Sequence, residues 1–364
     1  MSVTRRLILF ISLISKGYTM TRLIKPVRTA WWISLVLAAG VSTAAEAVTR
    51  NYYVAAEDVV WDYAPLGQNM IHCMGMPAPC PIPAPWTNSH VFNKIRYVEY
   101  TDATFAVKKP QPNWLGVLGP VIRAEVGDTI SVNFCNRSNS GNGYGMHPHG
   151  VKYDKNNEGA DYRGLNGTPA GAGAQVLPGA CYTYVWRADD GAGPALGDAS
   201  SKVWWYHSHI DEPMETNAGL LGPIIVTRKG SAKLDGSPID VDKEFVVAFF
   251  VFDELGGLEE GLMHSMNGYI FGNLPGLVTK NRDRVRWHLL GMGNEIDLHT
   301  PHWHGETATI GAPSFARRTD VVDLLPASMV TADMKMDNPG EWLFHCHVAD
   351  HLHAGMTATY QVLP

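Results

Sequence analysis

The histidines of this chain gather in four short clusters. Ten of the fifteen lie at positions 147 and 149, 207 and 209, 299, 302 and 304, and 345, 347 and 351. On an extended segment, residues i and i+2 project to the same side, so a His-x-His pair can present two imidazoles to one ion or to two neighbouring ions. Neutral imidazole suits copper, zinc and iron, whereas Mg²⁺ and Ca²⁺ prefer carboxylate oxygens. The spacing therefore predicts a transition-metal centre.

The five remaining histidines stand alone in the sequence. A lone histidine is more often a hydrogen-bonded core or surface residue than a metal ligand. That structural role is the interpretation for His72, His90, His264, His288 and His353.

One cysteine lies between two clustered histidines, in the motif His345-Cys346-His347. On an extended segment its thiol projects opposite to both imidazoles, so the motif can bind metals on two sides of a strand. His351 and Met356 follow on the side of the thiol, and His299 supplies a second imidazole from an earlier segment. Two His, one Cys and a weak axial Met form the blue-copper electron-transfer arrangement. A His/Cys zinc site would require neither the methionine nor the additional histidines.

Short strands are the elements expected to position these side chains. The chain contains 36 Gly and 23 Pro, and alternating or apolar runs are separated by turn residues, while helical periodicity is scarce. The predicted strands include residues 129–134, 182–186, 222–227, 245–252, 284–290 and 357–362. This pattern predicts an all-β protein built from β-sandwiches.

The two halves of the chain repeat one another. The segment Trp204–His209 resembles Trp342–His347, and a His-x-His-Gly precedes each of them, at 147–150 and 302–305. Two copies of one strand-rich unit explain the repetition. We predict a first domain over residues 48–228, a polar linker over 229–243 and a second domain over 244–364.

Residues 1–47 have the features of an export leader. Met20 offers an alternative start to Met1, and it precedes a basic segment, a short apolar run over 30–41 and the small-x-small sequence Ala45-Glu46-Ala47. A twin-arginine signal at Arg5-Arg6 and a retained membrane anchor are the alternatives. We expect export to the periplasm or secretion, and no membrane association after cleavage of the signal peptide.

Four cysteines besides Cys346 fit an oxidising compartment. Cys73 and Cys80 bracket a proline-rich loop, whereas Cys135 and Cys181 lie in strand-like runs. We expect the disulfides 73–80 and 135–181, but four cysteines allow three connectivities, and buried free thiols are the alternative.

The charge balance argues against a nucleic-acid binder. The chain carries 29 Lys and Arg against 35 Asp and Glu, a formal net charge of −6. Proteins that bind nucleic acids need a basic surface, which this composition does not supply.

Together these motifs resemble the multicopper oxidases, specifically the two-domain kind related to ceruloplasmin and the small laccases. The resemblance covers nearly all of the chain after the leader, and its most specific parts are residues 119–128, 147–150, 205–209 and 345–356. It implies two cupredoxin-like Greek-key sandwiches. It also implies copper as the cofactor, with one type 1 ion, one type 2 ion and a type 3 pair per chain equivalent.

Carried over position by position, the family pattern assigns a role to every clustered histidine. His299, Cys346, His351 and Met356 correspond to the type 1 ligands, and His147 and His302 to the type 2 ligands. The six type 3 ligands correspond to His149, His207, His209, His304, His345 and His347. The first domain has Ser208 and Leu220 where the second has Cys346 and Met356, so type 1 copper is expected only in the second domain. In this family the first-domain cluster of one subunit meets the second-domain cluster of its neighbour, which implies a homotrimer with interfacial trinuclear sites.

The resemblance further implies oxidation of a one-electron donor coupled to four-electron reduction of O₂ to water. Phenols and aromatic amines are the default donors, while an acidic rim with Asp350 and Glu254 would attract Fe²⁺ or Mn²⁺; ordinary surface acids are the alternative. Proton transfer needs a carboxylate near the trinuclear site, and Glu158 stands where the small laccases place one. Ala349 stands where other branches carry such an acid. The candidate catalytic residues are Glu158, Cys346 and Asp350; for Glu158, a solvated loop acid is the alternative.

Two other functions stay open at the level of sequence. A copper nitrite reductase is also a two-domain trimer, but it needs only three histidines at its type 2 site and carries type 1 copper in its first domain. A non-enzymatic periplasmic copper-binding or electron-transfer protein would hold one copper per chain and no type 3 pair. Consumption of O₂ or of nitrite, together with copper content, distinguishes the three.

Overall fold

Strands dominate the part of the chain that the structure describes. The computed structural model describes residues 47–364 except 72, 74 and 76, so the predicted leader lies outside the described residues apart from Ala47. Within them, two short α-helices accompany eighteen strands: α1 (Glu212–Ala218) and α2 (Ala349–His353). No helix of the described residues is long and apolar enough to cross a membrane. The all-β prediction is therefore confirmed.

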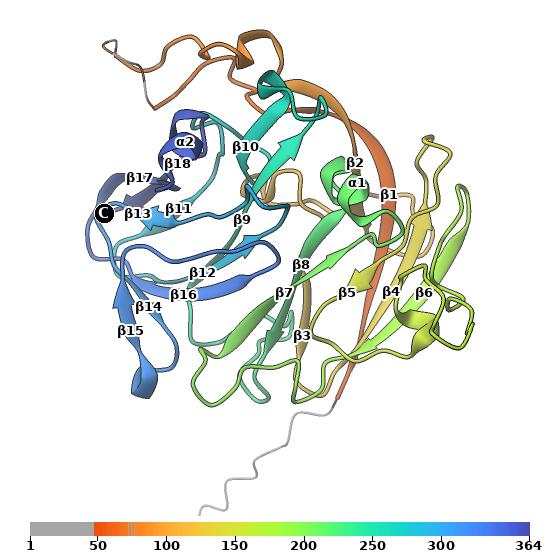
Figure 1. The fold of residues 1–364 in the computed structure, drawn as a ribbon. Coiled ribbons are helices and arrows are strands. Elements are labelled where there is room, and N and C mark those ends of the chain that lie inside the picture. The colour runs from red at the N-terminus through yellow and green to blue at the C-terminus, as the bar shows by residue number, and fades with distance from the viewer. Residues whose placement is uncertain (1–46, 72, 74, 76) are drawn as a thin grey trace, which may run out of the picture. The chain divides into compact units, whose positions relative to one another are not determined.

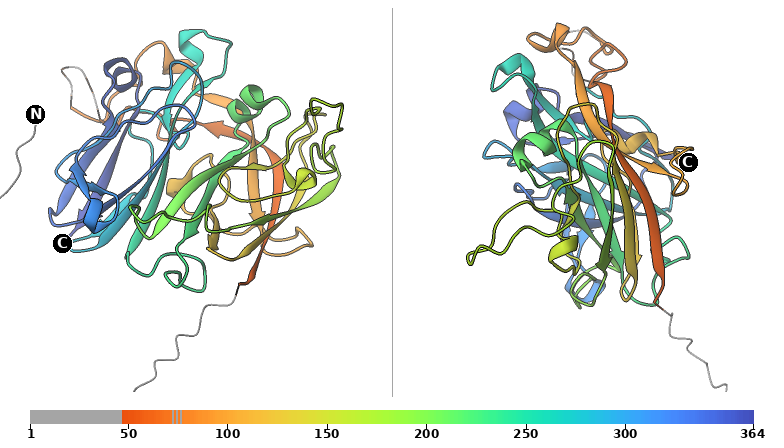
Figure 2. Two further views of the ribbon diagram at one scale, coloured as in Figure 1. Left: turned by 60° about the horizontal axis from the view of Figure 1, so that its bottom comes forward. Right: turned by 90° about the vertical axis from the view of Figure 1, so that its right-hand side faces the viewer.

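Strands from the first half of the chain form two four-stranded sheets. One has the order β2-β1-β4-β6 and the other β3-β8-β7-β5. In the right-hand view of Figure 2, the orange and yellow strands of the first sheet form one layer, and the green strands β7 and β8 lie beside it. The bounds are β1 (Thr49–Asp62), β2 (Val91–Tyr100), β3 (Ile122–Glu125), β4 (Thr129–Asn136), β5 (His147–Pro148), β6 (Cys181–Arg187), β7 (Ser201–His207) and β8 (Leu221–Thr227).

Strands from the second half form a six-stranded and a four-stranded sheet. Their orders are β10-β9-β12-β16-β14-β15 and β11-β18-β17-β13 (Figure 1). The bounds are β9 (Lys243–Asp253), β10 (Leu262–Met266), β11 (Val278–Lys280), β12 (Arg284–Gly291), β13 (Pro301–Trp303), β14 (Ala308–Ile310), β15 (Arg317–Thr319), β16 (Met329–Lys335), β17 (Gly340–Cys346) and β18 (Thr357–Leu363).

The repetition seen in the sequence is also present in the strand pairing. β1 pairs in parallel with β4 as β9 does with β12, and β3 pairs in parallel with β8 as β11 does with β18. Even the register of the histidines repeats: His147 lies opposite His207, and His302 lies opposite His345. The two halves are therefore copies of one cupredoxin-like unit, each carrying its histidines on equivalent strands.

Strand β9 connects the two halves through its two faces. Because side chains alternate along a strand, Phe245, Val247 and Phe249 enter the core of the second half, while Phe250 and Phe252 point the other way. That second face packs in a core with side chains of β7 and β8, including Trp205. The indole N–H of Trp205 also donates to the carbonyl of Gly291, at 3.0 Å. The uninterrupted apolar run of β9 is explained by burial on both faces.

Both expected disulfides are present. Cys73 pairs with Cys80, and Cys135 on β4 pairs with Cys181 at the start of β6. Cys346 is a free, buried cysteine. Disulfides persist in oxidising compartments, so this cysteine usage agrees with the predicted export.

Candidate metal centre

The first group of candidate ligands lies in the core of the second half. Cys346 ends β17, His351 lies in α2, and His299 precedes β13; all are at most 4% exposed. Nδ1 of His299 lies 3.2 Å from Nδ1 of His351, and the Cys346 sulfur lies 4.0 and 3.6 Å from these two nitrogens. Met356 is fully buried in the same core cluster, and its carbonyl accepts a hydrogen bond from the Cys346 N–H at 3.1 Å. The structure thus brings the four residues of the predicted type 1 site into one region.

A buried carboxylate orients His299. Nε2 of His299 lies 3.1 Å from Oδ1 of Asp297, which is itself fully buried and accepts from the Val251 N–H at 2.8 Å. With the proton on Nε2, the lone pair on Nδ1 faces the sulfur of Cys346. Asp297 was missed in the sequence, although its i, i+2 spacing from His299 was a usable signal.

The donor set of this group fits copper. Burial raises the pKa of the Cys346 thiol, an effect that the Thr300 N–H opposes by donating to the sulfur at 3.4 Å. A thiolate in this place is stable only beside a cation. Two imidazole nitrogens, one sulfur and a buried thioether are the donors that a blue-copper ion prefers.

A second group of four histidines lies on the first half of the chain. His147 begins β5 and His207 ends β7, with His149 and His209 two residues further along. The Nε2 atoms of His149 and His207 are 3.0 Å apart, and the rings of His147 and His209 have centroids 5.0 Å apart. The i, i+2 spacing has brought all four imidazoles together.

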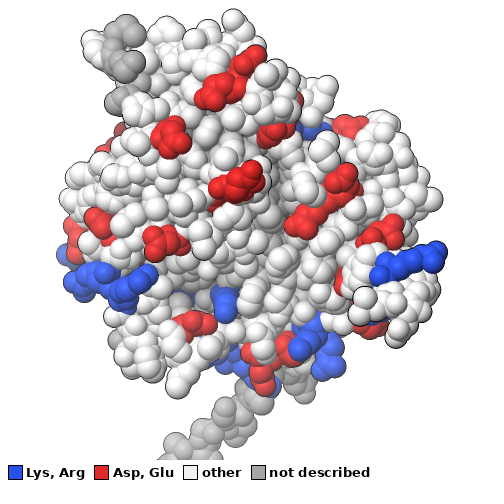
Figure 3. Space-filling view, in the orientation of Figure 1, with Lys and Arg blue, Asp and Glu red and all other residues white. Residues whose placement is uncertain are grey.

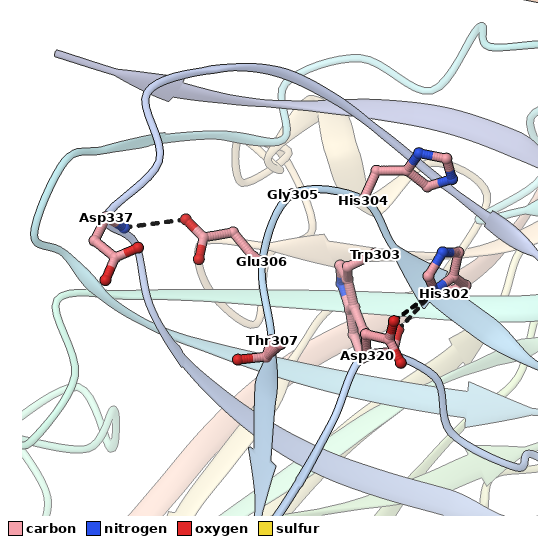
Figure 4. Close-up of a pocket in the computed structure, with 8 residues that line it drawn as sticks. All are labelled: His302, Trp303, His304, Gly305, Glu306, Thr307, Asp320 and Asp337. Atoms are coloured by element: carbon pink, nitrogen blue, oxygen red, sulfur yellow. Dashed lines mark hydrogen bonds and ion pairs between the residues drawn. The ribbon is translucent and has the colours of Figure 1, made fainter.

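The equivalent group lies on the second half. His302 and His304 project to the same side, with Trp303 turned away between them (Figure 4). Nε2 of His304 lies 3.1 Å from Nε2 of His345, and the ring centroids of His302 and His347 are 5.3 Å apart. These two groups are called the first-half and second-half His sets below.

Backbone carbonyls fix the ring orientation in both His sets. In four of the eight histidines Nδ1 lies 2.7 to 2.9 Å from a main-chain oxygen, which leaves Nε2 to face the other imidazoles. The pairs are His147 with Glu158, His207 with Ser208, His302 with Asp320, and His345 with Cys346. Burial lowers the pKa of His207 to about 3, and that of His149 and His345 to about 4. These rings are neutral at pH 7, as ligands of a metal must be.

The two His sets are separate within one chain. Ring contacts among the described residues join histidines inside each set, and none of them joins the two sets. A cavity of about 330 Å³ borders His147 and His149, and another of about 440 Å³ borders His302 and His304. His304 and His347 are exposed. Each set therefore lies beside a cavity, with His207 and His345 buried and the other six rings at least partly exposed.

The predicted acids are placed differently from one another. The main-chain oxygen of Glu158 contacts His147, and its carboxylate bonds Lys155 and, at 2.8 Å, Tyr162. Desolvation works to raise the pKa of Glu158, but these two partners outweigh it and lower the pKa. Asp350 is exposed on α2, next to His351. The expectation for Glu254 was wrong: its side chain is 8% exposed and pairs with Lys94 and Tyr63, so it forms no acidic rim.

His264 was assigned a purely structural role, and the structure places it against a candidate ligand. It lies on β10, is 7% exposed, and its ring centroid is 4.9 Å from that of His351. Its Nδ1 is buried without a hydrogen-bond partner. No spacing in the sequence signalled this contact, because it depends on how β10 packs beside α2.

Comparison with known proteins shows to which family the chain belongs. Two multicopper oxidase family profiles match, over residues 98–231 and 253–364. Among curated proteins, Ferroxidase HEPHL1 of Homo sapiens is 38% identical over 363 residues, which cover 91% of this chain and 30% of that protein. Hephaestin of Homo sapiens is 37% identical, with 87% of this chain and 30% of that protein covered. Ceruloplasmin of Rattus norvegicus is also 37% identical, with 86% and 31% covered. The chain thus spans about a third of the length of these relatives.

Solved structures share the fold. A crystal structure of a multicopper oxidase superposes with a TM-score of 0.59 at 21% identity, covering 86% of this chain and 89% of the other. The blue copper oxidase from Nitrosomonas europaea gives a TM-score of 0.56 at 19% identity, with 86% of each chain covered.

Proposed function

Because the chain belongs to the multicopper oxidase family, we propose that it oxidises one-electron donors and uses O₂ as the final acceptor. One observation carries this proposal. Cys346 lies buried with His299 and His351, while the residues on either side of it, His345 and His347, belong to the second-half His set. Three consecutive residues thus link an electron-accepting site to the place where O₂ would be reduced.

The residues divide into three sets of copper ligands in this proposal. His299, Cys346, His351 and Met356 hold type 1 copper; His147 and His302 hold type 2 copper; the other six clustered histidines hold the type 3 pair. Bound copper would supply the redox chemistry, accepting single electrons from the donor and delivering four of them to O₂. Asp297 and the four carbonyl acceptors hold the imidazoles in the tautomers that this binding needs.

A complete trinuclear site needs both His sets, and we propose that two chains provide them. Each set holds one buried imidazole and three that are at least partly exposed, and His304 and His347 are exposed. A homotrimer in which the first-half set of one chain faces the second-half set of the next would complete three sites. Glu158, whose main chain contacts His147, is the proposed residue for moving protons at that site.

Fe²⁺ is a proposed donor in addition to phenols and aromatic amines. One relative is named a ferroxidase. The ring of His264, whose buried Nδ1 has no hydrogen-bond partner, contacts that of His351, and the exposed Asp350 directly precedes His351; both groups suit a divalent cation. In the view of Figure 3, Asp and Glu are spread over the upper surface, where Figure 1 has β10, α1 and α2, and this field attracts cations.

Substituting the sulfur ligand tests the oxidase function. Cys346→Ser should abolish the blue absorption and the O₂ uptake with every donor, because the sulfur ligand of the electron-accepting copper site is lost. The measurements are the visible spectrum, copper content and O₂ consumption of copper-loaded protein with a phenol and with Fe²⁺. Retained turnover in the variant, or reduction of nitrite in place of O₂ by the unsubstituted protein, would contradict the proposal.

Substituting His264 tests Fe²⁺ as a donor. His264→Gln and Asp350→Asn should each raise the KM for Fe²⁺ about tenfold, because each removes a polar group worth about 1.4 kcal/mol to a bound cation. The KM for a phenol and the blue absorption should stay unchanged. Glu341→Gln, an exposed acid at the other end of β17, is the matched control. Equal effects on both donors would show that His264 acts only through His351.

A further inference from the structure

A carboxylate faces the first-half His set from the start of α1. Glu212 is the first residue of this helix and follows His209 by three positions. Its Oε2 lies 3.3 Å from Nε2 of His209, and its Oε1 lies 3.7 Å from Nε2 of His207. Nε2 of His207 also lies 3.0 Å from Nε2 of His149. One carboxylate and three imidazoles therefore come together within a single chain.

The nitrogen of His207 that faces Glu212 is the one left free for a metal. Its Nδ1 lies 2.9 Å from the main-chain oxygen of Ser208, so the proton lies on Nδ1 and the lone pair on Nε2. His207 is 1% exposed, and its ring has little room to turn away. A lone pair and a carboxylate oxygen have no proton to share, so a cation between them is the partner that satisfies both.

Helix α1 is held in place at both of its ends. Near its start, the buried carboxylate of Glu215 accepts from the Ile210 N–H at 2.9 Å. Near its end, the side-chain amide of Asn217 exchanges two hydrogen bonds with the main chain of Asp253 in β9, of 2.7 and 2.8 Å. Because the helix is anchored in this way, Glu212 is directed at the imidazoles before any ligand arrives, and little order has to be gained on binding.

The separations of these donor atoms match those of a four-coordinate metal site. Imidazole nitrogen and carboxylate oxygen bind Zn²⁺ at about 2.0 to 2.2 Å, so neighbouring ligand atoms of a tetrahedron lie about 3.3 to 3.6 Å apart. The three separations observed around His207 and Glu212 are 3.0, 3.3 and 3.7 Å. A metal ion therefore fits among these atoms with only small movements of the side chains.

The second-half His set has no carboxylate in the equivalent place. Aligned on its histidines, the repeat puts Asp350 where the first half has Glu212. Asp350 is one methylene shorter, is exposed on α2, and forms no ion pair with any histidine of the described residues. A carboxylate oxygen of Asp320 lies 3.9 Å from His302, but at Nδ1, which already contacts a main-chain oxygen. The two sets thus differ in their ability to hold a cation alone.

We propose that the first-half His set and Glu212 bind one divalent transition-metal ion within a single chain, with Glu212 as a ligand. The site uses imidazoles assigned above to type 2 and type 3 copper, but it goes beyond the oxidase function because it needs neither the second-half set nor a neighbouring chain. A carboxylate oxygen favours Zn²⁺, Co²⁺ or Cu²⁺ over Cu⁺, which prefers sulfur ligands. Its negative charge also offsets half of the charge of the ion. A chain with this site can take up its first metal ion before subunits assemble.

Binding of Zn²⁺ to the metal-free, full-length protein tests the site without copper or O₂. The background carries Cys346→Ser, which removes the sulfur ligand of the type 1 site, and His304→Ala, which disables the second-half set. Titration calorimetry should show one Zn²⁺ bound per chain. Adding Glu212→Gln or Glu212→Ala should each weaken this binding at least about tenfold, because losing a ligand costs no less than losing a group that only orients one. Asp211→Asn removes the neighbouring exposed charge, is the matched control, and should leave binding unchanged.

The outcomes separate this site from the oxidase function. If the background binds no Zn²⁺, or if Glu212→Gln binds it as tightly as Asp211→Asn does, the site is overturned even though the copper-loaded protein consumes O₂. Weaker Zn²⁺ binding in both Glu212 variants supports the site even if no donor drives O₂ uptake, a result that overturns the oxidase function instead. Two variants of the same residue, one of them nearly isosteric, keep the test valid if the other does not fold.

Discussion

Histidines serve both in the two His sets and beside the buried Cys346. In each place, the oxygen that lies against one ring nitrogen decides whether Nδ1 or Nε2 is left free to bind a metal. In the His sets, main-chain carbonyls lie against Nδ1 of His147 and His302 and leave Nε2 toward the neighbouring rings. At the buried cysteine, Asp297 lies against Nε2 of His299 and leaves Nδ1 toward the sulfur. The i, i+2 rule could predict which side each imidazole takes. It could not predict the tautomer, because the carbonyl acceptors are placed by the tertiary fold.

Removing the charge of Asp297 should therefore weaken copper binding at the type 1 site specifically. We expect Asp297→Asn to lower the affinity of that site about 10- to 100-fold, because the acceptor that fixes His299 is replaced by an amide. The measurement is a copper titration followed by the blue absorption. Asp320→Asn is the matched control, since its main-chain oxygen, which His302 contacts, is retained. Unchanged blue-copper affinity in Asp297→Asn would show that His299 is oriented by packing alone.

His264 shows what sequence reasoning misses at the residue scale. Because it stands alone in the sequence, it was interpreted as a core or surface residue and not as a metal ligand. Its functional interest comes only from burial without a partner for Nδ1 and from its contact with His351. Both facts depend on how β10 packs beside α2, which brings His264 and His351 together although they are 87 residues apart in the sequence, and no local pattern encodes that packing.

At the scale of elements, the sequence predicted the strands well where apolar runs were long. The expected strand 245–252 is observed as β9 (Lys243–Asp253), and 284–290 as β12 (Arg284–Gly291). The long strand β1 was not predicted, because its burial follows no strict alternation. The double role of β9 was also not predicted, since an apolar run shows burial on both faces but not which partner covers each face.

Polar contacts at the start of β9 make its packing sensitive to pH. Glu244 bonds His288 of β12 at 2.9 Å and pairs with Arg123 of β3, from the other half of the chain, at 2.8 Å. Desolvation works to raise the pKa of Glu244, but these partners outweigh it and lower the pKa from 4.5 to about 2. A carboxyl with a lowered folded-state pKa stabilises the protein above its unfolded pKa, and the contribution disappears as the pH falls from about 4.5 to about 2.

Replacing Glu244 should reproduce this acid effect at neutral pH. We expect Glu244→Gln to lower the free energy of unfolding at pH 7 by about 3 kcal/mol, and the difference from the unsubstituted protein to vanish as the pH approaches about 2. Chemical denaturation of the copper-free protein between pH 7 and pH 2 measures both. Asp242→Asn, whose pair with Arg284 is exposed, should cost at most about 1 kcal/mol. A difference that grows on acidification would contradict the sign of this argument.

At the scale of the whole molecule, the two halves share a core but keep their His sets apart. One hydrophobic cluster contains Trp205 from β7 together with Phe250 and Phe252 from β9, so the halves are packed against each other. The His sets nevertheless form separate groups, one on each half. The duplication in the sequence could predict two sets of four imidazoles. It could not predict the space between them, which depends on how the sandwiches pack, and so it could not establish whether one chain or two complete a site.

Mixing of subunits tests whether one chain or two neighbouring chains complete a trinuclear site. His149→Ala disables the first-half set and His304→Ala disables the second-half set, so each variant should lack O₂ uptake on its own. In a head-to-tail trimer assembled from equal amounts of both, about a quarter of the interfaces join two intact sets, and about a quarter of the activity should return. Mixing His149→Ala with His209→Ala is the control, because both changes disable the same set and no interface can be complete. If sites formed within single chains, the first mixture would stay as inactive as the control, and the trimeric arrangement would be excluded while the copper ligands proposed here would be unaffected.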